Sequence, residues 1–367
     1  MNRVAFITGD LLPMDGVMQP GGCAYYRQML PMNAALPHAA FGEPAFVGEL
    51  GFGVITGHNK AAFGFDTVVI KMLMQRWMPA QIRMAKKAGQ RIIVDMDDHY
   101  AALHEANRAF AGTDPSLNKI ANRDILDEVI READVLTVST PELYDYYQRR
   151  GIKDIRLIRN GVNPRQFPER KVRNRKPVLG WVGAIGWRAN DIETLYPWFN
   201  DFLVEYDLRF HHSGHTEDAP SFAEVAGIDP KRVTTSPMQN LSNYASLFAF
   251  DVGIVPMDDI PFNYAKSTIK GLEYALSGIP FVAQGLPEYE RLEGTGVGRV
   301  AWTEGDWVKE LTALLDYRTR KEAARKNRQN TINLHLIQYR LPEWRDLFEE
   351  GKPAPLRNQE VTYVLNK

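Results

Sequence analysis

One stretch in the last third of the sequence, residues 251–284, restricts the fold more than any other. It begins and ends with a short apolar run, which is typical of parallel strands covered on both faces. Between these runs the pattern predicts a helix over Lys266–Ser277, capped by Ser267 or Thr268 and ended by Gly278. Parallel strands joined through a helix are characteristic of α/β proteins, so we expect a parallel sheet.

The start of this helix has the composition of an anion site. Backbone N–H groups at a helix N-terminus favour a negative charge, and Lys266 and Lys270 would add two cations. Glu273 lies about two turns further along, where its carboxylate could accept hydrogen bonds from ribose hydroxyls. A nucleotide diphosphate would suit this arrangement. The alternative is an ordinary amphipathic helix between two core strands, since short motifs often match by chance.

The rest of the chain alternates in the same way. Strands are predicted at Arg3–Thr8, Thr67–Lys71, Arg91–Met96, Val135–Ser139, Ile155–Ile158, Pro177–Val182, Leu208–His212, Val233–Ser236, Val252–Pro256, Phe281–Ala283 and Gly298–Trp302. Helices are predicted at Tyr25–Leu36, Pro79–Ala88, Asn118–Ala133, Pro141–Arg150, Asp191–Glu205, Asn240–Ala249, Lys266–Ser277 and Asp306–Tyr317, and from Arg318 to about Glu350. Gly9–Gly22 is predicted to be a loop.

This order predicts two doubly wound Rossmann-like domains. The expected divisions are a first domain over 1–163, a linker over 164–176, a second domain over 177–325, helices returning toward the first domain over 326–350, and a tail over 351–367. Ligands of such sheets sit beyond the carboxyl ends of the strands. We therefore expect the loops at 21–22, 95–99, 183–186 and 257–266 to meet in a cleft between the domains.

Composition limits the environment of the protein. Of its 367 residues 44% are hydrophobic and 24% are charged, as in soluble globular proteins. The net charge of -1 argues against capture of nucleic acid or anionic membrane by the chain as a whole. A single cysteine, Cys23, excludes an internal disulfide. With neither a signal peptide nor an apolar stretch of membrane-spanning length, we expect a cytoplasmic protein.

Four passages, in order along the chain, carry a resemblance to a known family. They are ADVLTVSTPEL at 133–143, IRNGVN at 158–163 with Phe167 after it, LGWVG at 179–183, and the segment 256–283 with its Phe-Asn, Lys-Ser, Lys, Leu-Glu-Tyr and Gly-Ile-Pro elements. Together they resemble GT-B-fold glycosyltransferases of the retaining family-4 type. The resemblance implies two facing Rossmann-like domains, a nucleotide-sugar donor as co-substrate, no cofactor and no metal.

The resemblance also assigns roles to individual residues. Glu273 matches the carboxylate that binds the ribose hydroxyls, and Ser267 and Thr268 match the turn whose amides contact the donor phosphates. Gly183 matches the turn glycine that lets the backbone approach the diphosphate. On the acceptor side, the loop that would face the transferred sugar contains Gly21, Gly22 and Tyr25.

Two positions depart from the family pattern. Ala265 stands eight residues before the ribose-binding glutamate, where many family-4 enzymes have a second glutamate, so the motif does not specify the donor sugar. Ala184 replaces the arginine that usually follows the glycine turn. We expect Arg188 and Lys266 to neutralise the leaving diphosphate instead.

The acidic loop Asp95–His99 allows a competing interpretation. A strand followed by Asp-x-Asp is also how haloacid dehalogenase-type phosphatases present a nucleophilic aspartate and an acid with magnesium, here Asp95 and Asp97. In a GT-B enzyme the same loop would place Asp98 or His99 against the transferred sugar or the acceptor. A solvated loop without catalytic function is the third possibility.

The sequence therefore predicts a metal-independent, retaining glycosyltransferase that uses a UDP- or GDP-sugar. The alternatives are the magnesium-dependent phosphatase and a GT-B-fold sugar-nucleotide epimerase. The acceptor would be a glycan, a protein, or a hydroxymethylated DNA base. The last two are acceptors of the transferases of tailed phages, which the chain also resembles. Oligomeric state is not predicted.

Overall fold

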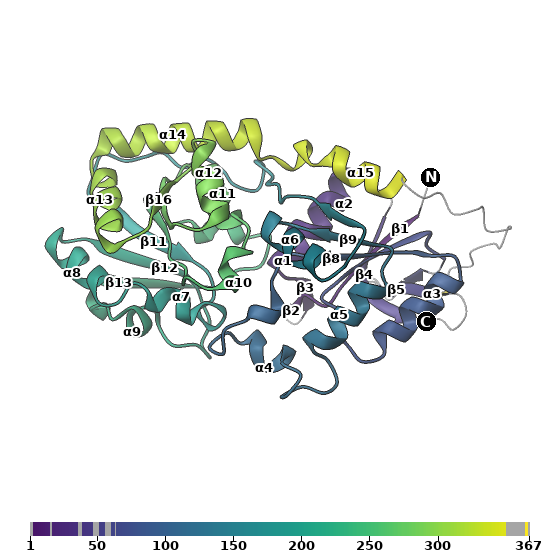
Figure 1. The fold of residues 1–367 in the computed structure, drawn as a ribbon. Coiled ribbons are helices and arrows are strands. Elements are labelled where there is room, and N and C mark those ends of the chain that lie inside the picture. The colour runs from purple at the N-terminus through teal and green to yellow at the C-terminus, as the bar shows by residue number, and fades with distance from the viewer. Residues whose placement is uncertain are drawn as a thin grey trace. The chain divides into compact units, whose positions relative to one another are not determined.

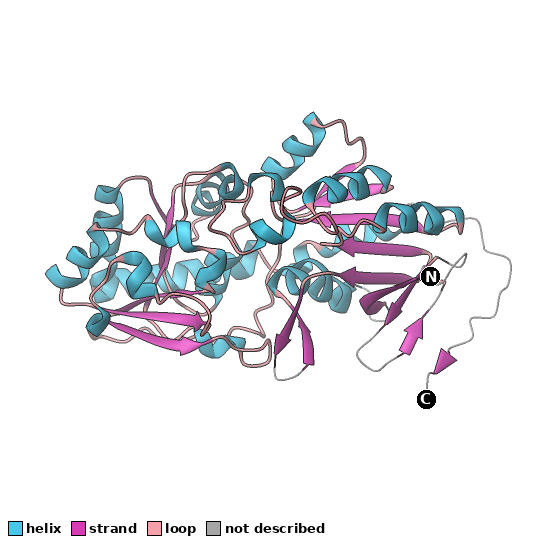
Figure 2. Cartoon of the chain, turned by 90° about the horizontal axis from the view of Figure 1, so that it is seen from below, coloured by secondary structure: helices cyan, strands magenta, loops and turns pink. Residues whose placement is uncertain are grey.

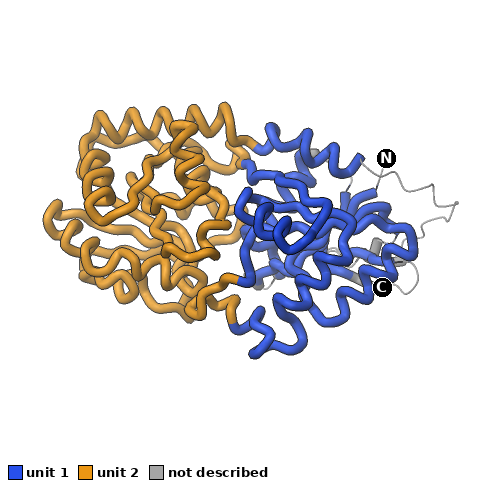
Figure 3. The backbone as a smooth tube through the Cα atoms, viewed as in Figure 1, with its two compact units in different colours: residues 1–101, 111–161, 337–367 blue, residues 102–110, 162–336 orange. Residues whose placement is uncertain are grey.

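A computed structural model describes residues 3–14, 17–35, 39–46, 51–55, 60–62, 64–349 and 364–365 of the chain. The chain divides into two compact units (Figure 3). Unit 1 consists of residues 1–101, 111–161 and 337–367, and unit 2 of residues 102–110 and 162–336. The segment predicted as a linker, 164–176, thus belongs to unit 2. Of the predicted tail, only 364–365 lies within the described residues.

Unit 1 is built on one nine-stranded sheet with the order β10-β9-β8-β7-β1-β4-β5-β6-β17 (Figures 1 and 2). Its six strands from β10 to β4 are parallel, and β5, β6 and β17 run antiparallel to their neighbours. A separate hairpin joins β2 and β3. The strands are β1 (Val4–Thr8), β2 (Leu11–Met14), β3 (Val17–Pro20), β4 (Ala40–Phe46), β5 (Phe52–Ile55), β6 (Lys60–Ala62), β7 (Thr67–Lys71), β8 (Arg91–Met96), β9 (Val135–Val138), β10 (Ile155–Leu157) and β17 (Val364–Leu365).

Helices cover the parallel part of this sheet. The carboxyl-terminal helix packs against α2, and its Trp344, Leu347 and Phe348 are buried with Val4 and Phe6 of β1. The helices and helical turns are α1 (Gly22–Ala24), the π-helical η1 (Tyr25–Met29), α2 (Leu30–Ala35), α3 (Met78–Lys87), η3 (Tyr100–Ala102), α4 (Ala109–Thr113), α5 (Arg123–Glu132), α6 (Pro141–Arg149), η7 (Ile337–Tyr339) and α15 (Leu341–Glu349).

Unit 2 contains a six-stranded, entirely parallel sheet with the order β13-β12-β11-β14-β15-β16. The chain fills one side of β11 with β12 and β13, then returns to its other side with β14. The switch point of this doubly wound sheet therefore lies between β11 and β14. The strands are β11 (Val178–Val182), β12 (Arg209–His215), β13 (Val233–Pro237), β14 (Val252–Val255), β15 (Phe281–Gln284) and β16 (Arg299–Ala301).

The core of unit 2 is rich in aromatic side chains, including Trp181, Phe199, Phe210 and Phe222. Its longest helix, α14, packs along α11 and α13. The helices and helical turns are η4 (Ile185–Trp187), α7 (Ala189–Glu193), α8 (Trp198–Glu205), α9 (Phe222–Ala226), η5 (Pro230–Arg232), η6 (Tyr244–Leu247), α10 (Pro261–Tyr264), α11 (Ile269–Leu276), α12 (Pro287–Gly294), α13 (Glu304–Leu315) and α14 (Tyr317–Leu334).

Several predicted elements were wrong. The predicted loop Gly9–Gly22 contains the β2–β3 hairpin and the first residue of α1, and the strands β4, β5 and β6 and the helix α12 were not predicted. In unit 2, Asn240–Ala249 forms only the short turn η6. Asp191–Glu205 forms two helices because the chain turns at Pro197 before α8.

The helix predicted over Asn118–Ala133 begins later, at Arg123. Asn122 is its N-cap, and its side-chain oxygen accepts hydrogen bonds from the backbone N–H groups of Asp124 and Ile125. The residues before it form a turn in which the side chain of Asn118 accepts from the N–H groups of Ile120 and Ala121. Asparagine side chains can replace helical backbone partners in this way, and this local competition moved the helix start.

Candidate functional site

The switch point of unit 2 joins the loops after β11 and β14 through one buried carboxylate. Asp191, at the start of α7, accepts hydrogen bonds from the backbone N–H of Asp258 (3.0 Å) and from Nδ2 of Asn263 (2.6 Å). Its other oxygen lies 3.3 Å from Nη1 of Arg188. Asp191 therefore fixes Arg188 beside the 257–263 loop, at the carboxyl ends of two neighbouring parallel strands.

Gly183 occupies the turn directly after β11. Its φ of +154° is one that side-chain-bearing residues rarely adopt, and an added Cβ would lie 2.7 Å from the ring of Trp181. Its N–H donates to the carbonyl of Ser213 (2.8 Å), and its carbonyl lies 2.9 Å from Nε2 of His212. Burial lowers the pKa of His212 to about 4, so this ring is neutral near pH 7 and donates from Nε2.

Lys270 reaches the same turn from α11. Its ammonium donates to the carbonyl of Val182 and lies 4.8 Å from the ring centre of Trp181. Burial lowers the pKa of Lys270 to about 8, and Arg188 adds to this effect, whereas Glu273 and Asp191 oppose it. The cations Lys270 and Arg188 and the carboxylates Glu273 and Asp191 thus interact electrostatically.

This environment makes the charge of Lys270 sensitive to alkaline pH. The ammonium of Lys270 is present below pH 8 and is lost above it, so kcat/KM for an anionic donor should fall as the pH rises through about 8. Initial rates measured from about pH 6 to about pH 10 would test this, and Lys270→Arg, which stays charged, should flatten the alkaline limb. If that limb is unchanged in the variant, another group causes it.

Glu273 is 2% exposed and accepts a hydrogen bond from the hydroxyl of Tyr244 (3.2 Å). Burial and the carboxylate of Glu273 raise the pKa of Tyr244, which keeps this donor protonated. Thr268 occupies the N-cap position of α11, one of the two predicted, but its side chain makes no capping hydrogen bond. Capping by Ser267 and phosphate binding at either residue stay predictions.

Lys266 precedes α11 and contacts an aromatic ring of α10. Its ammonium is 4.2 Å from the ring centre of Phe262, and its N–H donates to the carbonyl of Asn263 (3.1 Å). Its predicted role toward the diphosphate stays a prediction.

Unit 1 has its own polar edge, at the carboxyl ends of β7 and β8. The guanidinium of Arg27 binds Asp95 (Nη2 to Oδ1, 2.6 Å), and the ammonium of Lys71 lies 3.4 Å from Asp95 and 2.5 Å from Asp97. Burial by itself would raise the pKa of Asp95 and lower that of Lys71, but the neighbouring opposite charges reverse both shifts. Arg27, Lys71 and Asp95 are at most 1% exposed. Arg27, Lys71, Asp95 and Asp97 are together called the buried charge cluster below.

The three residues predicted for the acceptor side lie beside this cluster. Gly21 precedes α1, and an added Cβ there would overlap the carboxylate of Asp10. Asp10 in turn accepts a hydrogen bond from the N–H of Ala24 (2.7 Å) in α1. Gly22 begins α1, and Tyr25 begins the π-helical turn that carries Arg27 into the cluster. π-helical turns are frequent at functional sites, but contact of these residues with a sugar stays a prediction.

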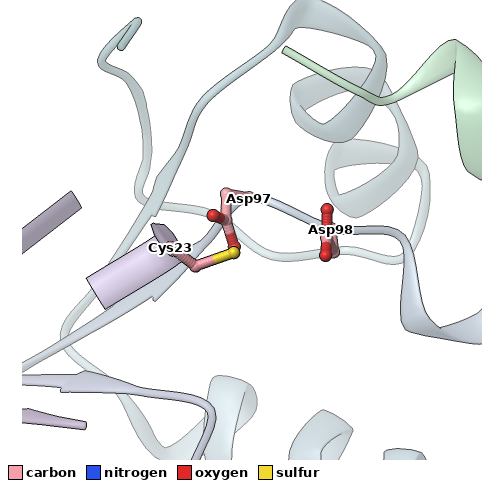
Figure 4. Close-up of side chains that lie close together, drawn as sticks. All are labelled: Cys23, Asp97 and Asp98. Atoms are coloured by element: carbon pink, nitrogen blue, oxygen red, sulfur yellow. The ribbon is translucent and has the colours of Figure 1, made fainter. Parts of the chain in front are cut away.

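The acidic loop after β8 places Asp97 and Asp98 near Cys23 (Figure 4). One ligand-type atom from each of the three lies within 4.8 Å of the others. Burial and both aspartates raise the pKa of the Cys23 thiol, so it stays protonated near neutral pH. The ring of His99 lies 4.1 Å from that of Tyr146. Catalytic roles for Asp98 and His99 stay predictions.

The geometry of Asp95 does not suit the phosphatase alternative. Its oxygens accept from Arg27, Lys71 and Thr137, the last at 2.6 Å, and the residue is fully buried. A carboxylate enclosed by three donors cannot approach a phosphorus atom without breaking the cluster.

Known proteins resemble the chain mainly in fold. Comparison with known protein families gives no match. TuaH of Bacillus subtilis (strain 168), a glycosyltransferase named for teichuronic acid biosynthesis, is 26% identical over 193 residues. That alignment covers 48% of this chain and 46% of TuaH, so the match spans about half of the relative.

Solved structures align over more of the chain. HepE of Anabaena in complex with UDP-glucose has a TM-score of 0.64 at 12% identity and covers 95% of this chain and 99% of its own. Sucrose-phosphate synthase of Thermosynechococcus elongatus has the same TM-score and coverage at 14% identity. TarM has a TM-score of 0.58 at 12% identity, over 77% of this chain and 55% of its own.

The chain has the GT-B fold. The predicted fold class, an α/β protein with two doubly wound Rossmann-like domains, is confirmed by both sheets and by these likenesses. The resemblance to GT-B-fold, family-4-like glycosyltransferases is thereby confirmed at the level of the fold, while the subgroup of its donor segment stays a prediction. Within the described residues, none of the helices combines the length and apolar character needed to cross a membrane.

Several residues that hold this edge of unit 2 together were not predicted. Asp191 and Tyr244 lie 82 and 29 positions before Glu273, and no local motif connects them to it. Lys71 and Asp10 were missed in unit 1. One signal was present: a charged residue directly after an apolar run, as in Lys71, marks a strand end at the edge where ligands bind.

Proposed function

We propose that the chain is a glycosyltransferase that moves a sugar from a UDP-sugar to an acceptor hydroxyl, with retention and without a metal. The observation that carries this proposal is the ammonium of Lys270, which lies against the Gly183 turn at the switch point of unit 2 and interacts electrostatically with Arg188 and Glu273. HepE, a protein of the same fold, has been solved with UDP and with UDP-glucose. TuaH bears the name of a glycosyltransferase.

The proposed reaction needs little covalent help from the protein. The acceptor oxygen forms a bond to the anomeric carbon as the bond from that carbon to the donor phosphate breaks. The electron pair leaves with UDP, and the acceptor proton passes to the leaving phosphate oxygen. Arg188, Lys270 and the N-terminus of α11 would stabilise the growing phosphate charge. Glu273 would accept from the ribose hydroxyls.

Unit 1 would supply the acceptor side. Gly21, Gly22, Tyr25, Asp98 and His99 lie at the carboxyl edge of its parallel strands, where ligands of such sheets bind. A glycan, a protein or a hydroxymethylated DNA base would serve as the acceptor, and mass spectrometry of products formed from candidate acceptors would distinguish them.

Nucleotide binding provides the direct test. UDP should raise the melting temperature of the protein equally with and without EDTA, and Glu273→Gln should weaken UDP binding about 10- to 100-fold, since it removes a charged acceptor. The matched control is Glu310→Gln. Glu310 lies on α13, where its carboxylate is paired with Arg299 of β16, and this variant should bind UDP normally.

Other outcomes would identify other functions. Phosphate release that requires magnesium and is abolished by Asp95→Asn would favour the phosphatase. Conversion of the sugar nucleotide to an epimer without any acceptor would favour the epimerase. UDP affinity unchanged in Glu273→Gln would refute the assigned ribose site.

A further inference from the structure

A short segment from the first third of the sequence belongs to unit 2. Residues 102–110, called the strap below, are separated in sequence from the rest of that unit by 51 residues, 111–161 (Figure 3). The strap lies on the loop that follows β11. Its position there is not explained by the proposed donor contacts, none of which it makes.

Hydrogen bonds fix the strap to the middle and the last residue of the turn η4. The N–H of Arg108 donates to the carbonyl of Gly186 (3.0 Å), and Nδ2 of Asn107 donates to the carbonyl of Trp187 (3.0 Å). Asn107 is 6% exposed, and its Oδ1 accepts from the N–H of Ala109 (2.9 Å), which holds the amide in this orientation. An added Cβ on Gly186 would overlap the Arg108 side chain, so a larger residue there would displace this guanidinium.

A second attachment joins the strap to the loop after β12. The guanidinium of Arg108 binds Asp218 twice, with Nη1 2.6 Å from the carboxylate Oδ2 and Nη2 2.8 Å from the backbone carbonyl. The hydrogen bond from Arg108 lowers the pKa of Asp218, so the carboxylate is ionised near neutral pH. One arginine thereby connects two loops that follow neighbouring parallel strands, β11 and β12.

We propose that the strap positions the donor loop Gly183–Arg188 and thereby sets the affinity of unit 2 for the nucleotide diphosphate. Arg188 directly follows η4, and its N–H donates to the carbonyl of Ile185 (2.7 Å), so the turn that the strap holds also holds the backbone of this cation. Arg108 is a positioning residue, because it acts through Gly186 and Arg188. The effect on donor affinity rests on the proposed function.

Two variants separate this role from a general effect on stability. Arg108→Ala removes the guanidinium, and Asp218→Ala removes its carboxylate partner. Each should raise the KM for the UDP-sugar and the Kd for UDP about tenfold, with a smaller change in kcat, because misplaced binding groups weaken ground-state and transition-state contacts alike. Arg325→Ala is the control, since Arg325 forms an ion pair of the same 2.6 Å length with Glu322, exposed on α14 of the same unit.

Hydrogen exchange tests the positioning directly and needs no assumption about the reaction. The amides of residues 185–188 should exchange faster in Arg108→Ala than in the wild type or Arg325→Ala. Arg108→Lys, which keeps the charge but not the double contact, should lie between them. Unchanged exchange at 185–188 would refute the strap's role. A wild-type protein that does not bind UDP would refute the proposed function, while the exchange data would still decide whether the strap positions the loop.

Discussion

Replacing Lys270 by methionine should lower kcat about 10²–10³-fold, the usual effect of removing one group that stabilises a developing anion. The ammonium of Lys270 lies beside the Gly183 turn and interacts with Arg188, so the substitution removes a cation from the turn where the phosphate charge would develop. Steady-state kinetics with a UDP-sugar would measure the loss.

Two lysines offer the comparison that this prediction needs. Lys309→Met changes an ammonium that is 78% exposed on α13 and should leave kcat unchanged. Lys266→Met changes the ammonium over the ring of Phe262 and measures the contribution of the second lysine predicted for the diphosphate. Burial already disfavours the Lys270 cation, so the Lys270→Met variant should still fold. Equal losses of kcat in Lys309→Met and Lys270→Met would contradict the assigned role of Lys270.

Replacing Lys71 by methionine should destabilise unit 1 by about 3–5 kcal/mol, the usual result of removing one partner from a buried ion pair. Asp97 would lose the ammonium at 2.5 Å, and Asp95 would keep only Arg27 as a cationic partner. The urea concentration at the midpoint of unfolding would report the loss, with exposed Lys153→Met as the control.

A double variant identifies the cause. Lys71→Met with Asp97→Asn removes the uncompensated charge, so it should recover at least about 1 kcal/mol of the loss. If the double variant is less stable than Lys71→Met alone, then lost packing rather than an unpaired carboxylate explains the effect. A loss below 1 kcal/mol in the single variant would show that water reaches Asp97.

The sequence was sufficient for the central strands and insufficient for the edges. β1, β7, β8, β11 and β14 are apolar on both faces, so their own residues identify them. β4, β5 and β6 lie toward the edge of the unit 1 sheet and contain alanine, glycine and proline, residues with weak strand preference. Their pairing depends on neighbours far along the chain, which local patterns do not contain.

Some residues of the candidate site could be predicted from local sequence and others could not. Gly183 and Glu273 stand in recognisable motifs, whereas Asp191, Tyr244 and Lys71 act through partners 26 to 72 positions away. Arg188 was predicted because Ala184 replaces the arginine that usually follows the glycine turn in the family. Its ion pair with Asp191 gives it a defined position. Which polar groups pair over a long sequence distance depends on the fold, so these pairs could not be predicted from local sequence.

The strap restricts where a chimera between this chain and a protein of the same fold can be joined, because unit 2 is made of two separate segments. A single crossover near residue 162 would take the donor loop from one parent and Arg108 from the other. The incoming Asp218 and Gly186 would then face a segment that did not evolve with them. A functional recombinant therefore needs two inherited blocks, 102–110 and 162–336, from the same parent.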